Sequence, residues 1–121
     1  MQASRPILVV DDDSDIREAL CQVLQDEGHH VVAAANGKEA FDHLRSSLRP
    51  RLILLDLMMP IMNGWEFRTE QLRDEALASI PVVIISADRE ARKKAVSIGA
   101  AGFLQKPIQL ESLLSIIEKY P

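Results

Sequence analysis

The stretch RLILLDLMMP, residues 51–60, decides the fold of this 121-residue chain. The continuous Leu and Ile run that follows Arg51 is typical of a parallel strand that is covered on both faces. The run stops at Asp56 and then turns apolar again. Removing an unpaired carboxylate from water is costly, so Asp56 at the end of a buried strand requires a partner or a function.

Five predicted strands alternate with helical segments along the chain. The strands are predicted at 6–10, 30–34, 51–55, 81–85 and 102–105, and three of them are nearly continuous runs of Val, Ile and Leu. Such alternation predicts an α/β fold, (βα)5, with a doubly wound five-stranded parallel sheet. The length fits a single domain, residues 1–121. Because the chain stops soon after the last helix, we expect no output domain in it.

Helices are predicted from apolar residues at helical spacing. Gly28 favours the end of the first helix, and Asn36 favours the start of the second. The third begins near Gly64, with Phe67 and Leu72 expected to face the core. The remaining helices are predicted at about 88–98 and 109–119. One apolar face of the last helix consists of Leu110, Leu113, Leu114 and Ile117.

Composition excludes several classes of protein. The hydrophobic fraction of 47% and the charged fraction of 26% are those of an ordinary globular protein. No apolar run approaches the roughly 20 residues of a membrane span, and MQASRP lacks the apolar centre of a signal peptide, so a cytoplasmic location is expected. The net charge of −4 argues against nucleic acid as the main partner. Cys21, the only cysteine, is expected to be a small core residue.

Polar side chains follow four of the five predicted strands. Asp11 and Asp12 follow the first, Asp56 the third, Ser86 the fourth and Lys106 the fifth. In an open parallel sheet the carboxyl ends of the strands form the ligand-binding edge, so we expect these side chains to gather there. Clustered carboxylates favour a cation, and an all-oxygen site suits Mg²⁺. The lysine and the serine would complete a site for a phosphoryl group, with an aspartate as its nucleophile.

These motifs resemble the receiver domain of two-component response regulators, a family with a flavodoxin-like fold. The matching segments are ILVVDDDSDIREAL, LILLDLMMPIMNG, VVIISA and GFLQKP. They occur in the order of the family, with 30 positions from Asp56 to Ser86 and 20 from Ser86 to Lys106. The resemblance covers nearly the whole chain.

The resemblance implies a role for each residue that matches a motif. Asp56 would be the phosphoacceptor. The Mg²⁺ ligands would be Asp11, Asp12, Asp56 and the backbone carbonyl of Met58.

The resemblance also implies roles for residues of the last two strands. Ser86 would contact the phosphoryl group and Lys106 would pair with it. Ser86 and Phe103 would act as the switch residues, with Phe103 changing its packing because it has no polar atom to bond. Pro107 matches the position of a cis peptide bond.

The implied function is a signalling switch in a phosphorelay. A histidine kinase or a histidine phosphotransfer protein would donate a phosphoryl group to Asp56. The change would alter the surface formed by 88–98, 102–105 and 109–119, which would bind a downstream protein target. Neither direct nucleic-acid binding nor membrane binding is expected. The domain would not be an enzyme, apart from its own phosphorylation and dephosphorylation.

Other functions are weighed against this one. An interaction module with a receiver fold but no phosphorylation would usually lack the site aspartate or lysine, and neither is missing. A phosphohydrolase of the haloacid dehalogenase group would need an aspartate two positions after the nucleophile, where this chain has Met58. A nucleotide-binding fold is disfavoured because neither G-x-G-x-x-G after the first strand nor G-x-x-x-x-G-K-[ST] occurs.

Overall fold

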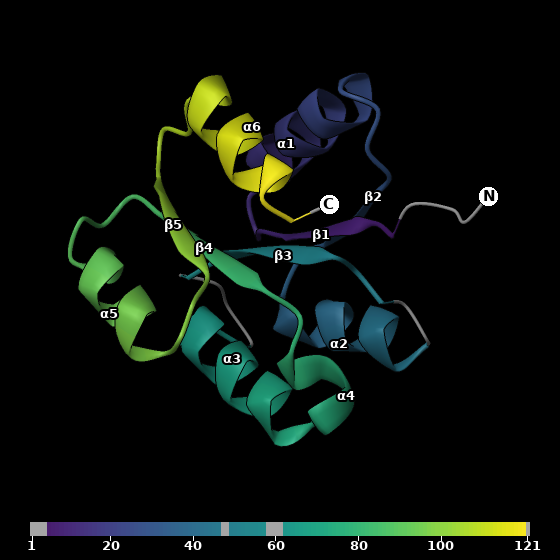
Figure 1. Ribbon diagram of the computed structural model, residues 1–121, viewed down its shortest axis with the longest axis vertical. Coiled ribbons are helices and arrows are strands. Elements are labelled where there is room, and N and C mark those ends of the chain that lie inside the picture. Colours follow the sequence, from purple (N-terminus) through teal and green to yellow (C-terminus); the bar gives the residue numbers. More distant parts are fainter. Residues whose placement is uncertain (1–4, 47–48, 58–61, 121) are drawn as a thin grey trace.

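The computed structural model of the chain describes residues 5–46, 49–57 and 62–120. Its centre is one parallel sheet with the strand order β2-β1-β3-β4-β5 and helices on both faces (Figure 1). The strands are β1 (Ile7–Val10), β2 (Val31–Ala34), β3 (Leu52–Asp56), β4 (Val82–Ser86) and β5 (Gly102–Gln105). Each bound lies within one residue of its prediction, and the (βα)5 doubly wound fold is confirmed.

Helices cover the sheet on both sides. They are α1 (Ser14–Asp26), α2 (Gly37–Arg45), α3 (Gly64–Arg73), α4 (Glu75–Ala78), α5 (Ala91–Ser97) and α6 (Leu110–Glu118). Figure 1 shows α1 and α6 together on one side, with α2, α3, α4 and α5 on the other. Within the described ranges, none of these helices has the length and hydropathy of a membrane span.

Alternate strand residues face two separate cores. On β1, Leu8 and Val10 pack toward α2 and α3, whereas Ile7 and Val9 pack toward α1 and α6. Both faces are buried, which is why the strands are apolar at consecutive positions. Cys21 is partly buried against the α1–α6 side, and this burial raises the pKa of its thiol.

Two predicted helix termini are confirmed by their hydrogen bonds. Gly28 has φ +89° after α1, and the amides of Gly28 and His29 donate to the carbonyls of Gln25 and Leu24, at 2.9 and 3.0 Å. This pair of hydrogen bonds is the Schellman motif, in which glycine is the favoured residue at the position with positive φ. At the start of α2, Asn36 Oδ1 accepts from the amide of Glu39 at 2.9 Å.

One predicted core position is wrong. Leu72 is 49% exposed, because polar residues of α3 take the inward positions. On the apolar face predicted for the last helix, Leu113 and Ile117 are buried and Leu110 is 51% exposed.

The fourth predicted helix, 88–98, is shorter than expected and begins at Ala91. Side chains bond the preceding backbone into turns instead: Ser86 Oγ accepts from the amide of Asp88 at 3.1 Å, and Asp88 Oδ1 from the amide of Glu90 at 2.9 Å. Such local bonds compete with helix formation. The short α4 was not predicted, and Asp74 caps it by accepting from the amide of Ala76 at 2.9 Å.

Candidate functional site

The carboxyl ends of the strands bring the predicted polar residues to one edge of the sheet. Asp11 follows β1, while Asp56 and Ser86 are the last residues of β3 and β4. Lys106 follows β5, and its amide donates to the carbonyl of Ser86 at 2.9 Å. Parallel pairing of β1 with β3, β3 with β4 and β4 with β5 therefore sets the spacing of these side chains.

Lys106 is the partner that the buried carboxylates require. Asp11 is 1% exposed and Asp56 is 5% exposed. Lys106 Nζ lies 3.2 Å from Asp11 Oδ2 and 3.7 Å from Asp56 Oδ2. One ammonium therefore faces two buried carboxylates, and salt screens such partly buried pairs less than it screens exposed ones.

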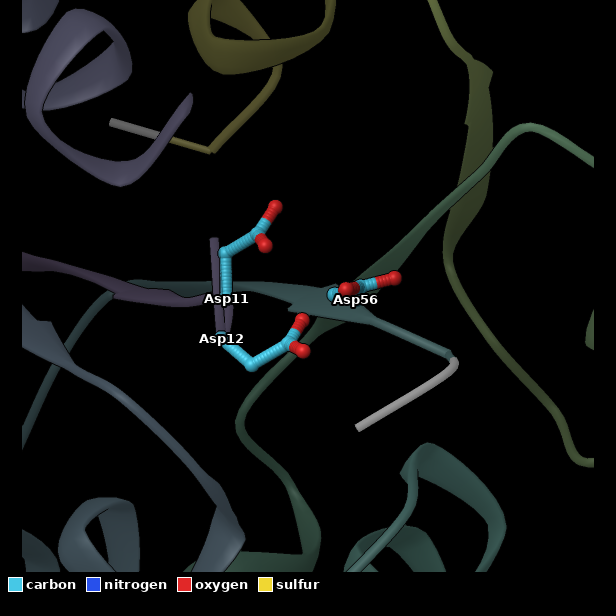
Figure 2. A group of neighbouring side chains, drawn as sticks. All are labelled: Asp11, Asp12 and Asp56. Carbon is cyan, nitrogen blue, oxygen red and sulfur yellow. The ribbon is translucent and has the colours of Figure 1, made fainter. Parts of the chain in front are cut away.

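Three carboxylates form a group that can hold a metal ion. Figure 2 shows Asp11, Asp12 and Asp56 turned toward a common space, and one oxygen from each lies within 4.8 Å of the others. Asp12 is exposed, so water reaches the group from its side. The ammonium of Lys106 balances only one of the three formal negative charges.

The donor set fits a hard divalent cation. Asp11 Oδ1 accepts from the amide of Asp13 at 2.9 Å, but its buried Oδ2 accepts no hydrogen bond within the described chain, although Lys106 Nζ is close. Oxygen ligands with access to water are those that Mg²⁺ prefers.

Ser86 and Lys106 line the same cleft as Asp12 and Asp56. The cleft, about 350 Å³ in volume, is bordered by Asp12, Asp13, Asp56, Ser86, Ala87, Asp88 and Lys106. Ser86 Oγ already accepts a hydrogen bond from a backbone amide, which leaves its own hydrogen available to a ligand. The cleft thus offers one hydroxyl donor and one ammonium beside the Asp56 carboxylate.

Other predicted residues lie outside this cleft. Phe103 is partly buried on β5, and the Arg92 guanidinium carbon lies 5.0 Å from the centre of its ring. The Lys106–Pro107 peptide bond is cis, as the resemblance implied. Asp13 caps α1 by accepting from the amides of Asp15 and Ile16. Met58, the predicted carbonyl ligand, lies outside the described residues.

Two supporting residues were not predicted from the sequence. Arg17 Nη1 donates to the carbonyl of Asp11 at 2.7 Å and so fixes the backbone beside the carboxylates. A Cβ at Gly64 would lie 3.0 Å from Leu57 Cα and 3.3 Å from the carbonyl oxygen of Asp56. Only glycine lets α3 begin so close to the end of β3. A glycine at a helix start was visible in the sequence, but its neighbour across the turn was not.

The comparison with protein families agrees with this geometry, since residues 7–118 match the model of the response regulator receiver domain. The chain belongs to this family. The receiver domain is 35% identical over 118 residues to the transcriptional regulatory protein CrdR of Helicobacter pylori, which covers 96% of this chain and 54% of that protein. This receiver domain spans about half the length of the first curated relatives that it matches.

Solved structures agree with the fold of the receiver domain. The chemotaxis response regulator CheY4 of Vibrio cholerae is 30% identical, with a TM-score of 0.87 over 98% of this chain and 100% of that one. A response regulator receiver protein of Pseudomonas putida, also 30% identical, has a TM-score of 0.88 over 98% and 99% of the two chains. The receiver domain therefore shares the architecture of these response regulators.

Proposed function

We propose that this receiver domain is a phosphorylation-dependent switch with Asp56 as the phosphoacceptor. The observation that supports the proposal is the arrangement of the buried Asp56 carboxylate beside an ammonium, a hydroxyl and the two further carboxylates of the metal-binding group. Phosphoryl transfer requires positioning and charge compensation more than covalent machinery. Nucleophile, cation and hydrogen-bond donor are all present in this cleft.

The donor is a phosphohistidine on a histidine kinase or a histidine phosphotransfer protein. A carboxylate oxygen of Asp56 attacks phosphorus, so an O–P bond forms while the N–P bond breaks and the donor imidazole keeps the electron pair. Lys106 faces the charge on the transferred group, and the Ser86 hydroxyl donates to one of its oxygens. Asp11, Asp12 and Asp56, with the carbonyl of Met58, would hold Mg²⁺, which neutralises phosphoryl oxygens when bound.

An apolar groove beside the cleft is a suitable surface for the donor. It lies between α1 and the segment before α6, with a volume of about 290 Å³, and its wall includes Lys106. The apolar lining is formed by Ile16, Ala19, Leu20, Val23, Ile108, Leu110 and Leu113. A helix of the donor that lies in this groove brings its histidine toward the cleft, since the two cavities share the lysine.

Phosphorylation is proposed to act through residues next to the cleft. The group adds a charge of about −1.5 to −2, which attracts the Ser86 hydroxyl. Movement of Ser86 disturbs the turn that it holds before α5 and lets Phe103 repack. The result is a shift between two conformations of the α5–β5–α6 surface, which binds a downstream target in the cytoplasm. No turnover beyond phosphorylation and dephosphorylation of Asp56 is proposed.

Intact-protein mass spectrometry tests the proposal. After incubation with acetyl phosphate, we expect a single phosphoryl adduct that requires Mg²⁺ and is absent from the Asp56→Asn variant. Asp42→Asn, an exposed carboxylate on α2, is the matched control and should be modified like the wild type. If no adduct forms, beryllofluoride binding separates a receiver that rejects small donors from an interaction module that is never phosphorylated. An adduct that persists in Asp56→Asn would contradict the assignment.

A further inference from the structure

The strand β2 forms an open edge of the sheet. It has β1 on one side, and no strand lies on its other side within the part of the chain that the structure describes. The carbonyls of His30 and Ala34 accept hydrogen bonds from the β1 side, at 2.9 and 3.2 Å. Because backbone groups alternate in direction along a strand, the amides and carbonyls of Val31 and Ala33 point away from the sheet.

The protein itself closes both ends of this edge. After β2, the amide of Ala35 donates to Glu39 Oε1 at 3.2 Å. Before β2, the amide of His29 donates back to a carbonyl of α1 at 3.0 Å. Between these two points, the outward groups of Val31 and Ala33 have no hydrogen-bond partner among the described residues. The open edge therefore consists of two amides and two carbonyls.

The strand β2 lacks the features that normally protect an edge strand. Its sequence, VVAA, includes neither a charged residue nor a proline, and Ala33 is exposed. A groove of about 490 Å³ lies between α1 and the strand, bordered on the strand side by Val31 and Ala33. Natural proteins usually block such an edge with lysine, proline or a covering segment. An unblocked edge with open space beside it is suited to the addition of another strand.

We propose that β2 pairs with β2 of a second copy of this chain, antiparallel and across a two-fold axis at Val32. In this register Val31 of each copy exchanges two hydrogen bonds with Ala33 of the other. Four hydrogen bonds then satisfy every outward group of both strands, and the closed ends leave none over. The edge is thus complementary to itself, which is the requirement for a two-fold interface.

Charged side chains beyond the ends of β2 favour the antiparallel direction. Glu27 and His30 lie before the strand, Lys38 and Glu39 lie after it, and all four are exposed. Antiparallel pairing brings the start of one strand beside the end of the other, so Glu27 faces the lysine of the second copy and His30 faces its Glu39. Parallel pairing would instead place like charges next to each other, which is destabilising.

Pairing at β2 leaves the functional surfaces of the receiver domain accessible. The strand β5 lies at the opposite edge, and antiparallel strands direct the two acidic clefts toward opposite ends of the joined sheet. Asp56 of each copy therefore stays open to a donor, and the inference does not depend on phosphorylation. Two copies present two α5–β5–α6 surfaces, which increases the avidity for a target with two binding sites.

Disulfide trapping tests the pairing and its register on the whole chain, with Cys21→Ala in every variant and copper phenanthroline as the oxidant. Residues at the two-fold axis form a non-hydrogen-bonded pair whose Cα atoms are roughly 4.5 Å apart, within reach of a disulfide. We therefore expect Val32→Cys to form a covalent dimer.

The matched control for trapping is Ala33→Cys. The two copies of this residue lie diagonally across the axis, at least roughly 7–8 Å apart, which is too far for a disulfide without backbone movement. Ala33 is more exposed than Val32, so random collisions would favour cross-linking of the control. Faster cross-linking of Val32→Cys thus reports the register and not the exposure.

Sedimentation equilibrium measures the same contact without a cross-link. We expect Ala33→Pro to weaken dimerisation by at least about ten-fold, since two of the four hydrogen bonds are lost. Pairing with β1 does not use the amide of Ala33, and proline is tolerated at such a position. Ala33→Lys keeps the amide, places like charges close to the axis and should also weaken the dimer. Its matched control is Val96→Lys, at an exposed valine on α5, which should dimerise like the wild type.

Three results would overturn the inference. The first is a wild type that stays monomeric at its highest soluble concentration. The second is cross-linking of Ala33→Cys that is as fast as that of Val32→Cys. The third is a dimer that Val96→Lys abolishes and Ala33→Lys leaves intact, since its contact would then lie on α5. If Ala33→Pro does not fold, Ala33→Lys decides the outcome.

Discussion

Asp12 is the residue at which the charge balance of the acidic cleft can be changed with least disturbance. It is exposed and forms no ion pair with Lys106, whereas Asp11 and Asp56 both do. We expect Asp12→Asn to raise the urea midpoint slightly without Mg²⁺, because one of three repelling carboxylates is removed. With Mg²⁺ at about 100 times its dissociation constant, the wild type should gain about 2.7 kcal/mol in unfolding free energy. The variant should gain much less.

Asp42→Asn is the matched control for this experiment, because it removes an exposed carboxylate on α2 that lies outside the metal-binding group. Its gain with Mg²⁺ should equal that of the wild type. An Asp12→Asn variant with an undiminished gain would show that Asp12 is not a ligand.

At the scale of the elements, a buried polar network joins α3 to the end of α5. Arg68 donates to the carbonyls of Ile98 and Gly99, both at 3.0 Å, and to Gln71 Oε1 at 2.9 Å. Gln71 Nε2 in turn donates to the carbonyls of Leu77 and Ile80. Burial lowers the pKa of the guanidinium, although arginine stays protonated. The network satisfies carbonyls at the C-terminus of α5, a short helix whose buried residues are Ala91 and Ala95.

We expect Arg68→Met to lower the free energy of unfolding by about 2–4 kcal/mol, because buried carbonyls lose charged donors. Hydrogen exchange of the α5 amides should become faster. Arg73→Met is the control on the same helix: Arg73 makes an exposed pair with Glu70 at 3.2 Å, and its loss should cost less than about 1 kcal/mol. Equal destabilisation by both variants, or unchanged exchange in α5, would refute a special role for Arg68.

The same network explains where sequence patterns predicted the elements well and where they did not. Strands covered on both faces must be apolar at every position. The apolar runs at 52–55 and 82–85 therefore predicted the bounds of β3 and β4 to within one residue. Leu72 was expected to face the core with Phe67, but five positions separate the two residues and place them on different faces of the helix. The core accepts Arg68 and Gln71 instead, since distant carbonyls satisfy them. Periodicity carries no information on partners so far away in the sequence.

At the scale of the molecule, the candidate site was predictable because topology alone brings it together. Parallel strands place their carboxyl ends at one edge, so Asp56, Ser86 and Lys106 had to meet there. The packing around the site was not predictable. Arg17 and Gly64 support it through contacts that depend on how α1 and α3 lie against the strand ends. The order and parallel direction of the strands determine which side chains meet at this edge. The packing of the helices determines how the backbone is held beside these side chains.

Basic side chains lie at the amino ends of the strands, at the opposite end of the sheet from the acidic cleft. Their contacts allow a test of how the stability of the protein depends on pH. There, Arg51 Nη1 donates to the carbonyl of Arg5 at 3.1 Å, and Arg51 Nη2 contacts His29 Nδ1. Burial lowers the pKa of His29 below its usual 6.5, Arg51 adds to this effect, and Glu27 opposes it. Only a neutral imidazole can accept from the guanidinium.

The pKa of His29 is lower in the folded state than in the unfolded state. As the pH falls below the unfolded-state pKa, the unfolded state therefore binds more protons than the folded state. The His29 contribution to stability is therefore complete above that pKa and is lost as the pH falls through the lower, folded value. Urea unfolding between about pH 7 and pH 5 should show a decline that is shallower in His29→Gln, since glutamine accepts from Arg51 and does not titrate in this range. His43→Gln, on α2, should keep the wild-type slope. If stability falls with pH equally steeply in the wild type and in His29→Gln, the carboxylates of the acidic cleft, and not the contact between His29 and Arg51, set the pH dependence of stability.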